Sequence, residues 1–314
     1  MNVTARKPRR WPRVLLRVVL ALAVLLLVLV LALVVVALRN PPQAADPRLA
    51  HRASPAPAID TAPAGGKPVL ILLHGAGLNA RMWKPVIRHL DPRWRVLALD
   101  LPGYGVRGDE DYTVEAARRA VVDAAARVAP AQVIVAGDSL GGYSAMVAAA
   151  ALPQAQLRGL VVSGASANFP AHPGFVDWAQ RLFIRLLVMR FGGEALGERA
   201  LTKVPFDAAD ARAIAAGGMH VEHIERTVDA LLGVDFVPVL AAIPQPVLFV
   251  NGDLDERAMA GEAGFVAATP HASVYNFKAS AHGVSILHPD GFARLLDTFA
   301  SEHFDQATSS GPAP

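Results

Sequence analysis

One serine, placed between an apolar run and a helix-like stretch, constrains the fold of this sequence most. Residues 137–142 read Gly-Asp-Ser-Leu-Gly-Gly; residues 133–136 before them are apolar, and residues 143–150 after them resemble a helix. Glycines on both sides of Ser139 let the backbone turn sharply, because glycine adopts conformations that other residues avoid. Such a strand-to-helix turn lifts a hydroxyl above the edge of a sheet and predicts Ser139 as a nucleophile. The alternative is an ordinary glycine-serine turn.

Apolar runs of strand length alternate with helix-length segments from residue 67 onward. The runs are 69–73, 95–99, 132–136, 160–163, 247–251 and 273–277. Continuous apolar strands interleaved with helices indicate an α/β fold, with a mostly parallel sheet covered by helices on both faces. Between residues 163 and 246 no strand is expected, but four helix-like pieces are: 176–190, 193–202, 208–216 and 221–232. We expect these pieces to form one helical insertion in the alternation, and we refer to it as the cap.

The N-terminal part of the chain contains a long apolar run preceded by basic residues. Residues 18–38 are all apolar, and at about 1.5 Å of rise per residue they would span a bilayer core of roughly 30 Å as a helix. Basic residues dominate before this run, which favours a cytoplasmic N-terminus and a catalytic domain on the outer side, periplasmic or extracellular. The prediction is a single-pass membrane protein with one transmembrane helix. A cleaved secretory signal is the alternative, although its apolar region is usually only about 7 to 15 residues long.

These features divide the chain into consecutive segments. The expected segments are a basic tail at 1–17, the anchor at 18–38, a linker rich in proline and alanine at 39–66, the first part of the catalytic core at 67–166, the cap at 167–245, the second part of the core at 246–302 and a disordered tail at 303–314.

Charge and cysteine content exclude several classes of function. The net charge is +3, but seven basic residues lie in the first 39 positions, and the remaining chain carries 23 basic and 27 acidic residues. A mildly acidic domain has no basic stripe for phosphates, so we expect no nucleic-acid partner. No cysteine is present, which excludes disulfides, a thiol nucleophile and thiolate metal sites.

Candidates for an acid and a base follow the serine in the chain. An acidic turn with Asp253 and Asp255 comes directly after the apolar run 247–250, and either aspartate could orient a base. His282 lies in a loop after the last expected strand. An imidazole there can take the serine proton and return it to a leaving group, so His282 is the predicted base.

With these residues assembled, residues 67–300 resemble the α/β-hydrolase superfamily. Within this superfamily, its sequence motifs are similar to those of pimeloyl-carrier-protein methyl ester esterases, which are capped serine carboxylesterases. The motifs that carry the resemblance are His74-Gly75-Ala76-Gly77-Leu78-Asn79-Ala80 with Trp83, Asp100-Leu101-Pro102-Gly103-Tyr104-Gly105, the nucleophile elbow at 137–142, and Ala281-His282 with His288-Pro289 and Phe292.

The resemblance implies roles for individual residues. Asp255 is the implied acid because it stands three residues after the turn glycine Gly252, and Asp253 is then a turn-stabilising residue. The implied oxyanion hole consists of backbone N–H groups of Leu140, which follows the nucleophile, and of Ala76 in the first loop. A serine at position 139 disfavours the epoxide hydrolases and haloalkane dehalogenases of the superfamily, which carry aspartate there.

Other polar residues have structural interpretations beside functional ones. His74 precedes the serine, and a hydrogen-bonding role is favoured over a role as base. His220 and His223 could share a metal ion, but no third ligand is in view and a solvated helix face is favoured. Asp138 could favour an imidazolium on His282 or bond to the backbone of the turn, and both interpretations stay open.

The sequence therefore predicts a membrane-anchored serine hydrolase that cleaves carboxylic esters through an acyl-enzyme. The partner expected is a small-molecule ester, with lipophilic esters as the candidate class, besides the membrane itself. No organic cofactor and no metal are required. Alternatives are the same triad acting on amides, thioesters or carbon–carbon bonds or in acyl transfer, and a non-catalytic scaffold that binds a small apolar ligand or a partner. The apolar side chains of the cap, Trp178, Phe183, Ile184, Leu187 and Met189, line a substrate pocket or seat the cap on the body.

Overall fold

The computed structural model describes residues 24, 57–61, 68–172 and 174–309. Within these residues seven strands form one sheet in the order β1-β3-β2-β4-β5-β6-β7. Neighbouring strands run parallel except for β1, which pairs antiparallel with β3. The strands are β1 Ile59–Asp60, β2 Val69–Leu73, β3 Arg95–Leu99, β4 Val133–Asp138, β5 Leu157–Ser163, β6 Val247–Gly252 and β7 Ala272–Phe277.

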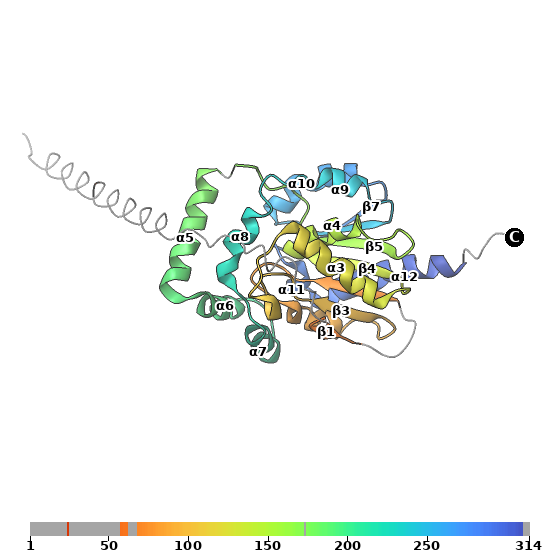
Figure 1. Cartoon of the computed structure of the whole chain (residues 1–314), viewed down its shortest axis with the longest axis horizontal. Helices are drawn as coiled ribbons and strands as arrows, with labels where there is room; N and C mark the ends of the chain where they lie inside the picture. Colours follow the sequence, from red (N-terminus) through yellow and green to blue (C-terminus); the bar gives the residue numbers. More distant parts are fainter. Residues whose placement is uncertain (1–23, 25–56, 62–67, 173, 310–314) are drawn as a thin grey trace, which may run out of the picture.

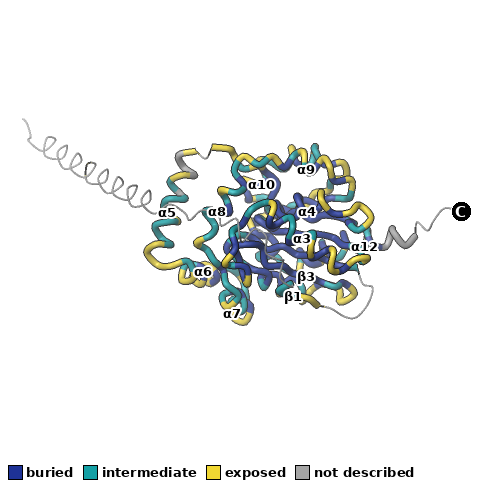
Figure 2. Tube along the Cα trace, in the orientation of Figure 1, coloured by how far each residue is buried: buried dark blue, intermediate teal, exposed yellow. Residues whose placement is uncertain are grey.

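Helices cover both faces of this sheet (Figure 1). Alternate residues of β2 enter two separate apolar cores: Ile71 packs into the core that contains α3 and α4, and Leu72 packs into the core that contains α2 and α12. Figure 2 shows the central strands as the most deeply buried part of the chain. The expected mostly parallel α/β architecture is confirmed. The helices outside the β5–β6 connection are η2 Ala80–Trp83, α2 Lys84–Ile87, η3 Gly105–Arg107, α3 Val114–Val128, α4 Leu140–Ala149, α10 Glu256–Ala268, α11 Val284–Leu287 and α12 Pro289–Ser309.

The connection between β5 and β6 is helical, as the sequence predicts. Its elements are α5 Phe175–Phe191, α6 Gly193–Leu201, α7 Ala208–Ala216, η4 Val221–His223, α8 Ile224–Asp229 and α9 Val237–Ala241. Helices α5 to α8 lie together beside the sheet, at the left of Figure 1. We refer to residues 167–245 as the cap, and their status as a separate domain stays a prediction.

Buried polar contacts tie one part of the cap to the core. The amide of Asn79 is fully buried and donates to the carbonyl oxygens of Ile214, at 2.7 Å, and Gly218, at 3.1 Å. Arg88 forms an ion pair of 2.6 Å with Asp210 at the start of α7. A buried amide left without these partners would cost about 1 to 3 kcal/mol, so the α7 end of the cap is firmly placed.

The predicted placement in a membrane is corrected. No helix within the described ranges is long and apolar enough to cross a bilayer. The predicted anchor, residues 18–38, lies outside the described residues except for Val24. The prediction relied on an apolar run and on the basic residues that precede it, and the single-pass location with an outward catalytic domain is not retained.

The predicted linker at 39–66 contains one short strand. β1 lies in this segment, where Ile59 pairs with Ala98 and Asp60 pairs with Leu97 of β3. Two residues are too few to produce an alternating or continuous apolar pattern, and the sequence prediction therefore did not include the strand. Most of the linker and the end of the predicted tail, residues 310–314, lie outside the described residues.

The helix that follows the serine packs directly on the end of β2, and this contact gives a testable prediction. A Cβ atom at Gly141 would lie 2.1 Å from the carbonyl oxygen of Leu73. Gly141→Ala must therefore displace backbone, and we expect the free energy of unfolding to fall by about 3 kcal/mol, measured by urea denaturation. Gly264→Ala in α10 is the matched control, because nothing lies within 4 Å of its added Cβ and alanine favours helix. Equal stability of the two variants would contradict the packing argument.

Candidate active site

Ser139 occupies a strained turn between β4 and α4. Its backbone angles are φ 53° and ψ −115°, which a residue with a side chain rarely adopts. The amide N–H of Ser139 donates to the carbonyl oxygen of Ser163 at 2.7 Å, which fixes the turn against the end of β5. Strain of this kind persists where the surrounding structure imposes it, typically at functional sites.

His282 and Asp255 meet the serine at the same edge of the sheet. Asp255 follows β6 and His282 follows β7, and the carboxyl ends of parallel strands share one edge. The Nδ1 atom of His282 lies 2.6 Å from Oδ2 of Asp255, and its Nε2 atom lies 2.9 Å from Oγ of Ser139. With Nδ1 carrying the proton, His282 donates to the carboxylate and accepts from the serine hydroxyl. The structure thus brings together the three residues that the sequence singles out.

His282 and Asp255 each stabilise the charged form of the other. The hydrogen bond from His282 to Asp255 raises the pKa of the imidazole, and this effect outweighs its partial burial. Burial alone would raise the pKa of Asp255, but the hydrogen bond and charge of His282 leave it below its usual value. Asp255 therefore stays ionised and stabilises a protonated His282.

Asp138 adds a second carboxyl group near the imidazole. It is buried, and its Oδ1 atom accepts a hydrogen bond of 2.7 Å from the hydroxyl of Ser163. Burial raises the pKa of Asp138, and the charge of His282 opposes that effect. The Ser163 partner was not predicted, because it depends on the register in which β4 pairs with β5. The charge of Asp138 raises the pKa of His282, as the electrostatic interpretation requires, and the choice between the two interpretations stays a prediction.

Replacing this carboxylate should change the pH dependence of turnover. Asp138→Asn removes a negative charge that raises the pKa of His282, so the imidazole of the variant stays neutral to lower pH. We expect the acidic limb of the kcat/KM profile to move to lower pH, measured between pH 4 and 9. Glu256→Gln, at an exposed acid beside Asp255, should leave the limb in place. A shift of the Asp138→Asn limb to higher pH would contradict this role.

The two predicted oxyanion donors belong to segments that adjoin the serine. Leu140 is the first residue of α4, where backbone N–H groups have no partner within the helix. The loop with Ala76 also lies close to the serine, since a Cβ atom at Gly75 would lie 3.6 Å from the Cβ of Ser139. Ala76 is half-buried and Leu140 is buried.

His74 and Asp100 hold the loops around the site. The Nδ1 atom of His74 donates to the carbonyl of the next residue at 2.8 Å, and its Nε2 atom accepts from the amide of Leu101 at 2.9 Å. Asp100 accepts backbone hydrogen bonds from Ala80 and Val106. Both ring nitrogens of His74 are engaged, so its structural interpretation agrees with the geometry.

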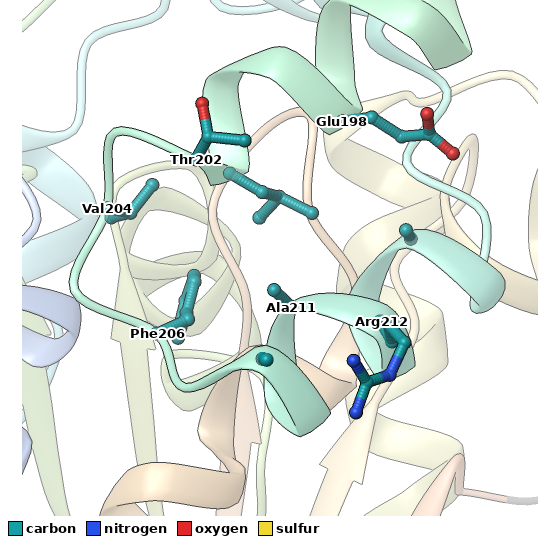
Figure 3. Close-up of a pocket in the computed structure, with 9 residues that line it drawn as sticks. Glu198, Thr202, Val204, Phe206, Ala211 and Arg212 are labelled. Carbon is teal, nitrogen blue, oxygen red and sulfur yellow. The ribbon is translucent and has the colours of Figure 1, made fainter.

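Of the cap side chains that the sequence singles out, Trp178, Phe183, Ile184 and Met189 on α5 are solvent-exposed, Trp178 to 42% and Phe183 to 62%, and Leu187 is half-buried. A pocket of about 430 Å³ opens elsewhere in the cap, between α6 and α7 (Figure 3). Ser139, His282 and Asp255 do not line this pocket. The lining residues are Glu198, Leu201, Thr202, Val204, Phe206, Ala208, Ala211, Arg212 and Ala215.

Comparison with known proteins agrees with this geometry. The pimeloyl-[acyl-carrier protein] methyl ester esterase of Xanthomonas oryzae is 30% identical over 253 residues, covering 76% of this chain and 96% of the relative. The esterase of the same name from Yersinia enterocolitica is 32% identical, covering 74% of this chain and 93% of the relative. The crystal structure of a membrane phospholipase A, described as a bacterial virulence factor, is 25% identical with a TM-score of 0.62, covering 93% of this chain and 99% of that one.

The profile of the alpha/beta hydrolase family matches residues 70–295, which include every strand of the sheet except β1 and the start of β2. The chain therefore belongs to the alpha/beta hydrolase family and is an ester-hydrolysing serine hydrolase.

Proposed function

We propose that Ser139, His282 and Asp255 form the catalytic triad of this hydrolase. The observation that carries the proposal is the continuous hydrogen-bond chain from Asp255 through His282 to Ser139, at 2.6 and 2.9 Å. Both distances lie in the range in which a base and a nucleophile exchange a proton. The strained backbone of Ser139 supports the same role.

The reaction proceeds in two halves. Oγ of Ser139 attacks the ester carbonyl carbon while Nε2 of His282 takes the hydroxyl proton, and the protonated imidazole then gives this proton to the departing alcohol. Water attacks the resulting acyl-enzyme with His282 again as base, releasing the carboxylic acid and restoring the serine. Asp255 holds the imidazole in the required tautomer and stabilises its charge.

The negative charge on the carbonyl oxygen needs preorganised donors. We assign this role to the backbone N–H groups of Ala76 and Leu140, whose segments adjoin Ser139. One such donor is typically worth about 3 to 4 kcal/mol of the barrier. The close approach of Gly75 to Ser139 supports the assignment, because it brings the first loop within reach of the same carbonyl.

The substrate class proposed is an ester of an aliphatic acyl chain. The relatives support it in two ways: one kind is named for a methyl ester of a pimeloyl group, and another is named a phospholipase A. The exposed apolar side chains of α5, which include Trp178 and Phe183, supply a surface suited to such chains. No feature of the described residues favours amide, thioester or carbon–carbon bond cleavage.

A chain-length series tests this substrate class. p-Nitrophenyl esters from acetate to palmitate would be compared by kcat/KM, after active serine has been counted with a fluorophosphonate. We expect labelling and a rise of kcat/KM as the acyl chain lengthens from two carbons. Labelling with a preference for acetate would contradict the substrate class and leave the triad standing, whereas folded protein that does not label would contradict the triad.

A further inference from the structure

Three side chains with metal-binding atoms meet where the cap begins α8. The ligand atoms that His220, Glu222 and His223 offer all lie within 4.8 Å of one another. Nδ1 of His220 lies 3.4 Å from Oε1 of Glu222. Two metal–ligand bonds of about 2.1 Å at a tetrahedral angle place their ligand atoms about 3.4 Å apart. This pair therefore already has the spacing of two ligands on one ion.

The backbone places His220 so that one ring edge is free for a ligand role. His220 has a left-handed backbone, φ 48° and ψ 48°, and directly precedes η4. Cβ atoms at Gly108 and Gly218 would lie 2.0 and 2.8 Å from its Nε2 atom, so this edge of the ring packs against the two glycines. The opposite edge, with Nδ1, faces Glu222.

His223 is oriented by the core. The Nδ1 atom of His223 lies 2.9 Å from the carbonyl oxygen of Gly103 and donates to it, which leaves the lone pair on Nε2. Metal-binding histidines commonly donate their second ring nitrogen to a backbone carbonyl in this way. The ring of His223 stacks on that of His220, with centroids 5.4 Å apart.

The third ligand, Glu222, contacts a different part of the structure from the two histidines. A Cβ atom at Gly193, the first residue of α6, would lie 1.9 Å from Oε2 of Glu222. The carboxylate therefore packs against the start of α6, while the two imidazoles pack against the loop after β3. The cap and the core thus both restrain the three side chains.

We propose that His220, Glu222 and His223 bind one divalent transition-metal ion, of which Zn²⁺ fits the donor set best. Two imidazoles and one carboxylate suit Zn²⁺, whereas Ca²⁺ and Mg²⁺ prefer oxygen ligands. All three ligands belong to residues 220–223, so the ion holds this segment of the cap in the conformation in which His223 donates to the carbonyl of Gly103 in the loop after β3. It takes no part in the chemistry at Ser139, because the triad needs no Lewis acid. The sequence raised His220 and His223 as a possible metal pair but favoured a solvated helix face, because Glu222 becomes evident as a third ligand only in the folded chain.

The ion would also stabilise the surroundings of the catalytic serine. A Cβ atom at Gly77 would lie 2.8 Å from Cδ1 of Ile224 and 3.9 Å from Cγ2 of Val221, so two chain neighbours of the ligands pack against the loop that contains Ala76. A ligand that binds the folded state alone stabilises it. Zn²⁺ should therefore raise the Tm of the protein by several degrees.

Calorimetric titration of the metal-free full chain with ZnCl₂ tests the proposal. We expect one equivalent of Zn²⁺ to bind and the Tm to rise, and we expect His220→Asn and Glu222→Gln each to weaken binding at least tenfold. Asparagine is chosen at 220 because it tolerates the left-handed backbone, so the loop keeps its shape. Circular dichroism of each variant checks the fold.

Two controls make the result decisive. His89→Asn removes an exposed histidine outside the cluster and should bind Zn²⁺ as tightly as the unmodified chain. CaCl₂ should not bind with comparable affinity. The proposal is overturned if no saturable equivalent of Zn²⁺ binds, if the two ligand variants bind as tightly as the unmodified chain, or if Ca²⁺ binds equally well.

Discussion

Ser139→Ala is expected to lower kcat for ester hydrolysis about a millionfold, because a nucleophile and its base act as a unit and the remaining groups cannot form an acyl-enzyme. The free energy of unfolding should change little, since the Oγ atom of Ser139 is only partly buried and its known partner is the half-exposed His282. Steady-state hydrolysis of a p-nitrophenyl ester gives the kinetic result, and fluorophosphonate labelling should disappear in the variant.

A serine far from the site provides the control. Ser301→Ala removes a hydroxyl of α12 that donates to the carbonyl of Asp297, and both turnover and labelling should persist. If Ser139→Ala retained more than a small fraction of the turnover, the assignment of the nucleophile would fail. Loss of labelling with retained turnover would instead indicate that another residue carries out the hydrolysis.

Asp255→Asn is expected to lower kcat about ten-thousandfold, as an amide in this position favours the wrong tautomer of the neighbouring imidazole. The fold should be retained, because Asp255 also caps α10 by accepting from the amide of Ala258, and asparagine is an equally good cap. Measurement of kcat together with the urea midpoint separates the two effects.

The neighbouring aspartate distinguishes the two candidates for the acid. Asp253 accepts from the amide of Ser280 at 3.3 Å and lies 3.8 Å from Nζ of Lys278, so it stabilises the turn beside β7. Asp253→Asn should reduce kcat only a few-fold. A larger loss for Asp253→Asn than for Asp255→Asn would reverse the assignment.

Strand positions were predictable because the central strands are buried on both faces. Every residue of β2 is 1% exposed or less, which requires the unbroken apolar run seen in the sequence. The cap helices were predictable because residues 163–246 contain helix-like pieces and no apolar run of strand type, and α7 has the bounds 208–216 that were expected. A strand of two residues such as β1 carries no such pattern.

Contacts between elements were not predictable from the sequence. Ser163 reaches Asp138 because β4 and β5 pair in one particular register, and a shift of that register would separate the two side chains. Glu222 approaches His220 because of a left-handed turn at a residue other than glycine, which no sequence pattern specifies. Residue types therefore suggest the proposed triad, whereas the groups that tune it depend on packing.

The position of the three site residues along the chain governs when activity can appear. Ser139 and His282 are 143 positions apart, and His282 follows the edge strand β7, the last strand of the sheet to be synthesised. Proteins emerge from the ribosome N-terminus first, so the serine and its turn are made long before the base exists. With His282 as the proposed base, we expect a nascent chain to hydrolyse esters only after β7 has paired with β6. Recovery of turnover during refolding therefore reports completion of the sheet edge. It does not report formation of the central strands.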